Sequence, residues 1–489
     1  MIVPRVKRLG WTTLLVIVFF FLLLQIPDDP DLGINLGVGR FIIATKTVPR
    51  SDLFSFSLPD HPYVYHSWLG QLIITLVYDS QNTIQHSLIM LSIAWTLIAT
   101  TAMYLLYRLC RRSFWSLCLL FLSATLVFSS LGVRPQMFTF LFLVLESHIL
   151  LGWRQRKSAF YLLPLIPLFL LWANLHLGFV IGIGSMWFFI FVEQGRSMFS
   201  NTPRPQLRVF FSPFLVAIAA TLATLLNPFG LKLYEQAYRI SQNPYNLTAN
   251  LEWAPLVSRG ITHWLFAGIA LLFFVLLARQ KKVDWTLYCL SLVLYWLTLR
   301  NTRTVVPFLV FFLPLVSHML ASLSPAWRVN WKSVRSNPSI VVAFVALLAA
   351  LLLRTFTNTF IVSQSTSNPR ILANRMSYPY GAVVFMKTTP LPTRLLNFYN
   401  WGGYLVWQIP QMRVFETGIM DTFQRGDRLF LDDYFSLVNA KPEWENLMEY
   451  YQIDSVLLPP ELPLVQILKK ESDWHIEYKD STSILMRKK

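Results

Sequence analysis

Charged residues are scarce in this chain. Only 14% of its 489 residues are Asp, Glu, Lys or Arg, whereas 54% are hydrophobic and the mean hydropathy is +0.48. Soluble domains carry about 25% charged residues, so this composition predicts a polytopic membrane protein. The net charge of +17 comes largely from short Lys and Arg clusters between apolar runs. No basic stripe with interleaved aromatic residues forms a surface, so we expect no nucleic-acid partner.

Cysteine and the common catalytic motifs are also lacking. Cys110, Cys118 and Cys289 lie in or beside apolar runs, with no metal-ligand spacing and no disulfide framework. The chain contains no GxGxxG fingerprint, P-loop, HExxH or GxSxG motif, which argues against nucleotide hydrolysis, zinc proteolysis and α/β-hydrolase chemistry. It also lacks the internal repeats and paired broken helices that are typical of secondary transporters.

Long apolar runs dominate what is present. A spanning helix needs about 20 mostly apolar residues, and on that rule the sequence predicts about eleven spans. They lie near residues 9–26, 85–108, 114–131, 136–152, 159–173, 175–192, 209–226, 263–279, 284–299, 304–322 and 338–354.

The basic clusters between these runs predict the orientation. Arg5, Lys7 and Arg8 place the N-terminus in the cytoplasm, and alternation then makes every cytoplasmic loop basic, as the positive-inside rule requires. This agreement holds only if residues 64–78 form an amphipathic helix at the outer interface within a first external loop, residues 27–84. An odd number of spans places the C-terminus outside. We expect a protein of the cytoplasmic (inner) membrane.

Residues 355–489 differ in composition from the rest. They combine mixed charge, Pro and Gly with pieces at 394–409 and 454–460 that resemble strands and with helical segments expected around 431–451. ILMRKK at 484–489 closes the chain after the turn-like KDSTS. We therefore expect a transmembrane domain at 1–354 followed by a small extracytoplasmic α+β domain at 355–489.

Acidic residues directly follow the first span. Asp28, Asp29 and Asp31 stand at a predicted membrane face, where charges are costly and often functional. Asp29 or Asp31 could act as a general base or bind a divalent cation such as Mg²⁺ or Mn²⁺. The alternative is a helix-terminating turn, since Asp-Pro sequences break helices; Asp28 is better explained in this way.

A second group of polar residues consists of arginines at predicted outer ends of spans. An arginine there could hold a lipid phosphate through bidentate hydrogen bonds, or it could contact ordinary headgroups. These candidates are Arg134, Arg259, Arg300 and Arg303.

A third group could line the same external cleft. Glu252 beside Trp253 is typical of a carbohydrate contact, although an exposed loop pair is equally consistent, and a lone histidine among apolar residues is usually structural. The candidates are Asp52, His61, His66, Trp68, Asn174, His176, Glu252 and Trp253.

Several stretches together resemble a known group of membrane enzymes. One span, an acidic external loop, many further spans and a terminal external domain resemble the GT-C superfamily of polyprenyl-phosphate-sugar-dependent glycosyltransferases. DPDLGINLGVGRFI, HSWLGQL, WANLHLGF and NWGGYLVW…VFETGIMDTF are similar to a bacterial GT-C-like family. The resemblance departs at Asn35, where a histidine is expected, and at Glu416-Thr-Gly, where Asp-Gly-Arg is usual; Asp421 remains.

The resemblance implies the function. Asp29 or Asp31 would be the catalytic acid of the first loop, and Arg300 or Arg303 would hold the donor phosphate. The partners would be a polyprenyl-phosphate-linked sugar donor and a glycan, lipid or protein acceptor. Two alternatives remain open: a non-catalytic scaffold for assembly of cell-envelope polysaccharide, and a lipid or polysaccharide transporter.

Overall fold

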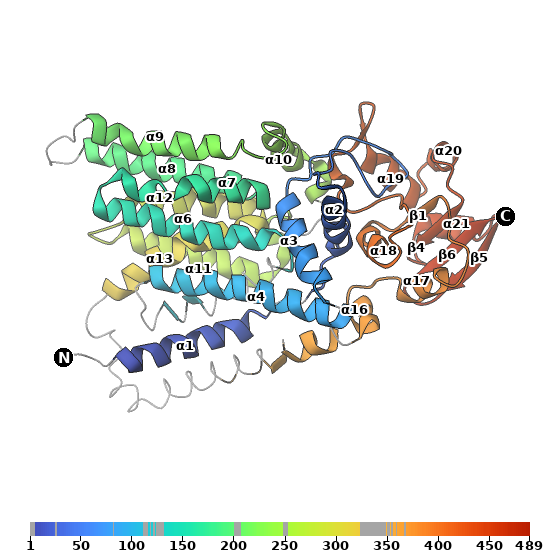
Figure 1. The fold of residues 1–489 in the computed structure, drawn as a ribbon, viewed down its shortest axis with the longest axis horizontal. Helices are drawn as coiled ribbons and strands as arrows, with labels where there is room; N and C mark the ends of the chain where they lie inside the picture. Colours follow the sequence, from blue (N-terminus) through green and yellow to red (C-terminus); the bar gives the residue numbers. More distant parts are fainter. Residues whose placement is uncertain are drawn as a thin grey trace. The chain divides into compact units, whose positions relative to one another are not determined.

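In the computed structural model (Figure 1), helices occupy most of the positions that the sequence predicts to cross the membrane. The chain forms two units: residues 1–25, 92–230 and 246–362 make the first, and residues 26–91, 231–245 and 363–489 make the second. The structure describes, with isolated residues besides, 5–24, 27–81, 83–110, 132–199, 207–247, 253–322 and 368–489.

The first unit is a bundle of apolar helices. Its described helices are α1 (Arg5–Leu22), the larger part of α4 (Ile84–Leu109), α6 (Gln136–Arg156), α7 (Leu165–Leu175), α8 (Phe179–Met198), α9 (Leu207–Ala223), α11 (Ile261–Ala278), α12 (Trp285–Arg300) and α13 (Val305–Ser322).

Four described helical stretches are long and apolar enough to cross a membrane: 84–109, 136–156, 261–278 and 302–320. The predicted spans near 114–131 and 338–354 lie largely outside the described residues. The exact number of spans therefore stays a prediction, whereas the mostly helical character of the chain, with several apolar helices, is confirmed.

Polar contacts join three of these helices at the ends predicted to face the cytoplasm. Arg154 of α6 pairs with Asp284 at 2.8 Å, and Thr286 of α12 donates to Glu193 of α8 at 2.6 Å. Ion pairs and hydrogen bonds strengthen in a low-dielectric setting. These contacts therefore hold α6, α8 and α12 together at these ends.

The second unit contains a four-stranded sheet with the order β1-β4-β6-β5. β1 (Leu395–Asn397) pairs in parallel with β4 (Ser455–Leu458), and β6 (Ile484–Lys488) pairs antiparallel with β4 and with β5 (Trp474–Lys479). The helices of this region are α16 (Pro369–Arg375), α17 (Tyr380–Met386), α18 (Gly402–Gln408), α19 (Phe430–Val438), α20 (Trp444–Tyr450) and α21 (Pro463–Leu468).

Two stretches that are distant in sequence belong to this same unit. The first loop contributes α2 (Leu32–Thr45) and α3 (Trp68–Asp79), and residues 231–245 contribute α10 (Lys232–Gln242). Asn243 donates to the backbone oxygen of Asp421 at 2.9 Å, and Gln236 lies 3.2 Å from the Thr422 hydroxyl. The segment around Asp421 is therefore held by a loop that comes nearly 180 residues earlier in the chain.

Three predicted elements are confirmed and one is wrong in part. Residues 68–79 are helical, residues 455–458 are a strand, and α19 and α20 account for the predicted helical segment. The apolar piece at 394–409 is a strand only at Leu395–Asn397 and then becomes α18. A short apolar run buried on every side has the same composition in a strand and in a helix, which is why the pattern misled.

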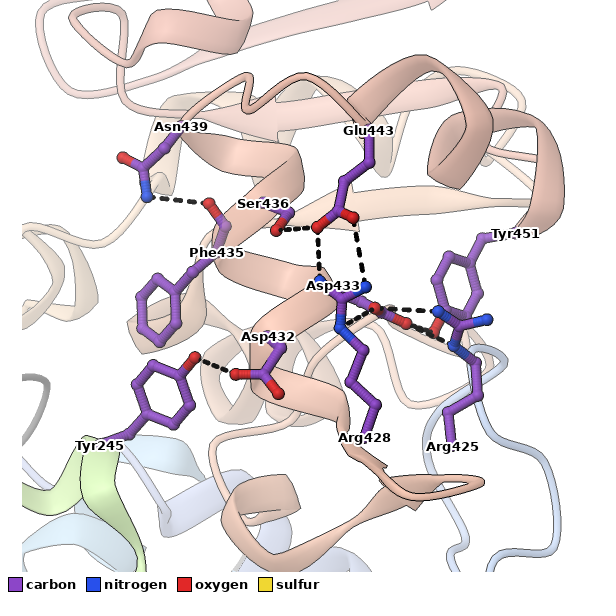
Figure 2. Close-up of polar contacts among 10 residues, drawn as sticks. All are labelled: Tyr245, Arg425, Arg428, Asp432, Asp433, Phe435, Ser436, Asn439, Glu443 and Tyr451. Atoms are coloured by element: carbon purple, nitrogen blue, oxygen red, sulfur yellow. Dashed lines mark hydrogen bonds and ion pairs between the residues drawn. The ribbon is translucent and has the colours of Figure 1, made fainter.

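A buried charge network fixes the β2–β3 hairpin (Gln424–Arg425 and Arg428–Leu429) to α19 (Figure 2). Asp433 is fully buried and accepts from Arg425 at 2.6 and 3.0 Å and from the Tyr451 hydroxyl at 2.7 Å. Arg428 pairs with Glu443, and Tyr245 donates to Asp432. The hairpin begins at Gln424, shortly after Asp421, so this network also anchors the C-terminal side of the segment around Asp421.

Candidate active site

Asp29 and Asp31 have different tasks in the turn that precedes α2. Asp29 is 6% exposed, and its carboxylate accepts a hydrogen bond from the Asp31 backbone N–H at 2.7 Å. Asp31 is the N-cap residue of α2, yet its side chain makes no capping hydrogen bond, although Asp is among the preferred capping residues. Asp29 therefore shapes the turn, whereas the partly exposed Asp31 carboxylate is not used to cap the helix.

Glycines bring the start of α18 into direct backbone contact with this turn. A Cβ at Gly403 would lie 2.1 Å from the Pro30 carbonyl oxygen, and a Cβ at Gly33 would lie 1.9 Å from the Gly403 carbonyl oxygen. Side chains cannot occupy such distances, so only glycine permits this approach. The NWGG sequence thus fixes the backbone on which Asp31 stands.

A second turn, Glu416–Gly418, borders the Asp31 carboxylate. Asn397 is buried at the end of β1; its side-chain oxygen accepts from the backbone N–H groups of Phe415 and Glu416, at 2.9 and 3.1 Å. The Gly418 N–H donates to both Glu416 carboxyl oxygens at 2.8 Å. Gly418 has φ +87°, and a Cβ there would lie 3.5 Å from Asp31 Oδ1.

Acids and tyrosines share one environment around these two turns. Burial raises the pKa of the fully buried Glu416 well above its ordinary value, and Asp421 and Asp31 raise it further. The Tyr399 hydroxyl donates to Asp421 at 2.6 Å, and burial, followed by Asp421, Glu416 and Asp31, raises the Tyr399 pKa. The region is thus rich in acceptors, and its tyrosines keep their protons.

Two more predicted residues of the loop have structural contacts, one within the loop and one to the terminal segment. Asp52 accepts from the Ser55 N–H at 2.8 Å and from the Ser55 hydroxyl at 2.5 Å. The His61 ring stacks on Phe423 with centroids 4.3 Å apart, and its Nε2 accepts from the Gln424 N–H at 3.3 Å. Burial lowers the His61 pKa. Both side chains have structural partners.

His66 and Trp68 lie at the start of α3. His66 Nδ1 is 2.9 Å from the Ser67 hydroxyl, and Trp68 is the first residue of the helix. Their place in a substrate cleft stays a prediction.

In the bundle, two of the predicted arginines stack on tryptophans. The Arg303 guanidinium lies 4.6 Å from the Trp253 ring centroid, and Arg300 lies 4.3 Å from that of Trp296. Thr302 donates to the Ala254 carbonyl oxygen through its N–H and its hydroxyl. The α12–α13 corner thereby brings Arg303, which is exposed, against the half-buried Trp253.

The other predicted bundle residues lie elsewhere. Arg134 precedes α6 and is half-buried, and its carbonyl oxygen accepts from Trp95 at 2.8 Å. Arg259 is described through its backbone only, in a 3-10 turn at Leu256–Arg259, and Glu252 lies outside the described residues.

Asn174 and His176 make structural contacts at the end of α7. Asn174 donates to the carbonyl oxygens of Leu170 and Leu226 at 2.8 and 3.0 Å. His176 Nδ1 accepts from the Gly178 N–H at 3.0 Å and lies 2.9 Å from the Thr139 hydroxyl. These bonds join α7 to the starts of α8 and α6 and to the end of α9.

No family model and no curated protein matches the sequence. Solved structures do match. One is the archaeal oligosaccharyltransferase AglB from Archaeoglobus fulgidus in complex with an inhibitory peptide and a dolichol-phosphate, with TM-score 0.59 and 12% identity over 99% of this chain and 75% of that one. Another is ArnT from Cupriavidus metallidurans bound to undecaprenyl phosphate, with TM-score 0.51 and 10% identity over 99% and 98%. This chain has the GT-C fold.

A further A. fulgidus oligosaccharyltransferase structure, tethered to an acceptor peptide by a disulfide bond, has TM-score 0.54 and 12% identity over 98% of this chain and 74% of that one. The GT-C likeness therefore extends over nearly the whole chain, and at these identities it concerns the fold.

A further feature of the site is its capacity to hold a metal ion. Within the described ranges, no group of three or more His, Cys, Asp or Glu side chains is placed to hold a metal ion. Asp29 is used in its turn and Glu416 is bonded to Gly418. The assignment of Asp29 and Asp31 as metal ligands stays a prediction, and no step below passes through a metal.

Sequence reasoning missed Glu416 and Tyr399 as neighbours of Asp31. The only signal was the unusual Glu416-Thr-Gly sequence, which suggested a weaker role for the terminal domain. The structure instead places this turn against Asp31, and no local pattern could have shown that two turns almost 400 residues apart meet.

Proposed function

We propose that the protein is a membrane glycosyltransferase that moves a sugar from a polyprenyl-phosphate-linked donor to an acceptor on the outer side of the membrane. The GT-C fold supports this proposal, since two structures that share it hold dolichol-phosphate and undecaprenyl phosphate. The observation that carries it is the place of Asp31, a partly exposed carboxylate at the start of α2 that the Glu416–Gly418 turn borders.

Asp31 acts as the general base in this proposal. Its carboxylate takes the proton of the acceptor hydroxyl or amine, and the acceptor atom forms a bond to the anomeric carbon. The bond between that carbon and the phosphate oxygen breaks on the opposite face, so the configuration inverts. Polyprenyl phosphate leaves with the electron pair.

The bundle arginines stabilise the leaving group. Arg300 and Arg303 end α12 and begin the turn to α13, and their stacking on tryptophans holds the guanidinium planes in place. A fixed guanidinium can donate two parallel hydrogen bonds to a phosphate without loss of side-chain freedom during the reaction.

The orientation completes the proposal. The N-terminus is cytoplasmic, and the terminal domain, together with the first external loop, is extracytoplasmic. The acceptor is a glycan, a lipid or a protein of the cell envelope.

The test compares Asp31→Asn with Asp28→Asn in purified full-length protein supplied with a panel of undecaprenyl-phosphate sugars. Asp28 lies in the same turn but pairs with Arg375 at 3.3 Å, so it is a matched control. We expect release of undecaprenyl phosphate to fall about 100-fold or more in Asp31→Asn, in the range typical of a lost general base, and to change little in Asp28→Asn. Full activity in an Asp29→Asn, Asp31→Asn double variant would contradict the general-base role, whereas no release by any of the proteins, wild type included, would favour the scaffold alternative.

A further inference from the structure

Glu416 has no task in the reaction just described, yet it is among the most buried acids of the second unit. Its side chain is fully buried, and no basic side chain among the described residues is paired with it. Its carboxyl oxygens accept from the Gly418 N–H. A buried carboxyl without a counter-charge is costly, so the structure must gain something from it.

We propose that Glu416 is a positioning residue for Asp31: its carboxyl accepts from the Gly418 N–H and thereby keeps the Glu416–Gly418 turn against the Asp31 carboxylate. This inference rests on the proposed role of Asp31 as the base. It gives a residue of the terminal region a structural role beside the proposed base.

The two ends of the turn are fixed by different means. Asn397 fixes the entry, since its amide nitrogen also donates to the Glu416 carbonyl oxygen at 2.8 Å. A Cβ at Gly402 would lie 2.1 Å from that same oxygen, so the entry is packed on α18 as well. At the exit, Gly418 is in the left-handed region, and the bonds described for its N–H go to Glu416. Removal of the carboxyl therefore releases the half of the turn that borders Asp31.

The charge of Glu416 matters because other acids surround it. The titratable groups that interact with its charge are Asp31, Asp421, Tyr399 and Tyr434. Asp421 is already bonded to Tyr399. Carboxylates in one buried site do not all ionise. A neutral hydrogen-bonding group at position 416 would add no further charge to this site.

The first test needs no substrate. Hydrogen exchange is followed by mass spectrometry in peptides that cover residues 27–36 and 412–423 of the full-length protein, in wild type, Glu416→Gln and Glu416→Ala. We expect Glu416→Ala to speed exchange in both peptides about tenfold or more, and Glu416→Gln, which keeps an acceptor for Gly418, to stay within about twofold of wild type. Unchanged exchange in Glu416→Ala would overturn the proposal.

Glu443→Ala serves as the matched control, because Glu443 is an acid of the same domain that bonds Arg428 and Ser436 instead. We expect it to leave peptide 27–36 unchanged. If Glu416→Ala does not fold, Glu416→Gln still decides: a folded Gln variant with fast exchange in peptide 412–423 would contradict an uncharged hydrogen-bonding role.

The second test measures donor turnover in the same variants. Glu416→Gln should retain the wild-type rate within about threefold and the same pH profile, whereas Glu416→Ala should lower kcat about tenfold or more with little change in the donor KM. Equal loss in both variants would show that the negative charge is required and would overturn the proposal. Inactivity of every protein, wild type included, would count against the proposed function, while the exchange results would still decide the positioning role.

Discussion

Asp29 and Asp31 are two residues apart; the hydrogen bond between them gives Asp29 a structural role, whereas Asp31 is the base that we propose. The sequence predicted that one of the pair is functional and could not choose between them, because Asp-Pro-Asp suits a turn and a catalytic carboxylate equally well. The choice depends on the Asp29–Asp31 hydrogen bond and on the missing cap, and neither can be inferred from spacing.

A stability comparison tests this separation. Asp29→Ala removes an acceptor from the Asp31 N–H in a buried turn, and we expect it to lower the free energy of unfolding by about 1–2 kcal/mol. Asp31→Asn should change stability by less than about 0.5 kcal/mol. The thermal midpoints of the detergent-solubilised variants measure the difference, and a larger loss in Asp31→Asn would contradict the assignment.

Glu443 gives a pH prediction with a definite sign. Hydrogen bonds from Arg428 and then Ser436 lower its pKa from 4.5 to about 2. A pKa that is lower in the folded state stabilises the fold above the ordinary pKa, and this contribution is lost as the pH falls from about 5 to 2. The thermal midpoint of wild type should exceed that of Glu443→Gln at pH 6, and the difference should shrink as the pH approaches 2. A difference in thermal midpoint that grows on acidification would contradict the predicted sign.

Among the secondary-structure elements, the start of α18 is where the sequence prediction was wrong and the structure explains why. The residues NWGGYLVW were expected in a strand, whereas the glycine pair begins a helix that touches the Asp28–Asp31 turn through its backbone. The alternation and number of apolar residues indicate which residues are buried. They do not show which distant backbone segment packs against a glycine.

Gly403→Ala tests this contact. A methyl group 2.1 Å from the Pro30 oxygen requires the two backbones to separate, and we expect a loss of about 3 kcal/mol, the upper range for overpacking, together with loss of turnover. Gly195→Ala is the control, since this helical glycine has nothing within 4 Å of its added Cβ. Its thermal midpoint should be unchanged or slightly higher. Equal thermal midpoints for the two variants would contradict the close approach.

The hairpin network of Figure 2 makes a separate prediction at the same scale. Arg425→Ala leaves the fully buried Asp433 with Tyr451 and with Arg428 at 3.4 Å. Breaking a buried pair costs about 3–5 kcal/mol, and the remaining partners reduce the expected loss to about 2 kcal/mol. Adding Asp433→Asn should recover part of it in denaturation measurements; a double variant less stable than Arg425→Ala would rule out charge burial as the cause.

At the scale of the whole molecule, the sequence predicted a membrane bundle and a separate terminal region, and the GT-C resemblance supplied the expected layout. Composition and hydropathy suffice for this, because apolar length and basic loops are physical requirements of a membrane. They do not show that residues 26–91 and 231–245 join residues 363–489 in one unit, because that association depends on contacts such as Asn243 with Asp421.

Donor binding is the central claim at this scale, and it can be measured without knowledge of the sugar or the acceptor. The experiment is titration of the purified full-length protein with undecaprenyl phosphate, comparing wild type with the Arg300→Ala, Arg303→Ala double variant. The control is Arg279→Ala with Lys281→Ala, which removes the same charge from exposed positions at the predicted cytoplasmic end of α11. We predict a loss of affinity of about tenfold or more in the first variant, as expected for lost hydrogen bonds to a charged group, and little change in the control. Equal affinity of all three proteins, or no preference for undecaprenyl phosphate over ordinary phospholipid, would contradict the account.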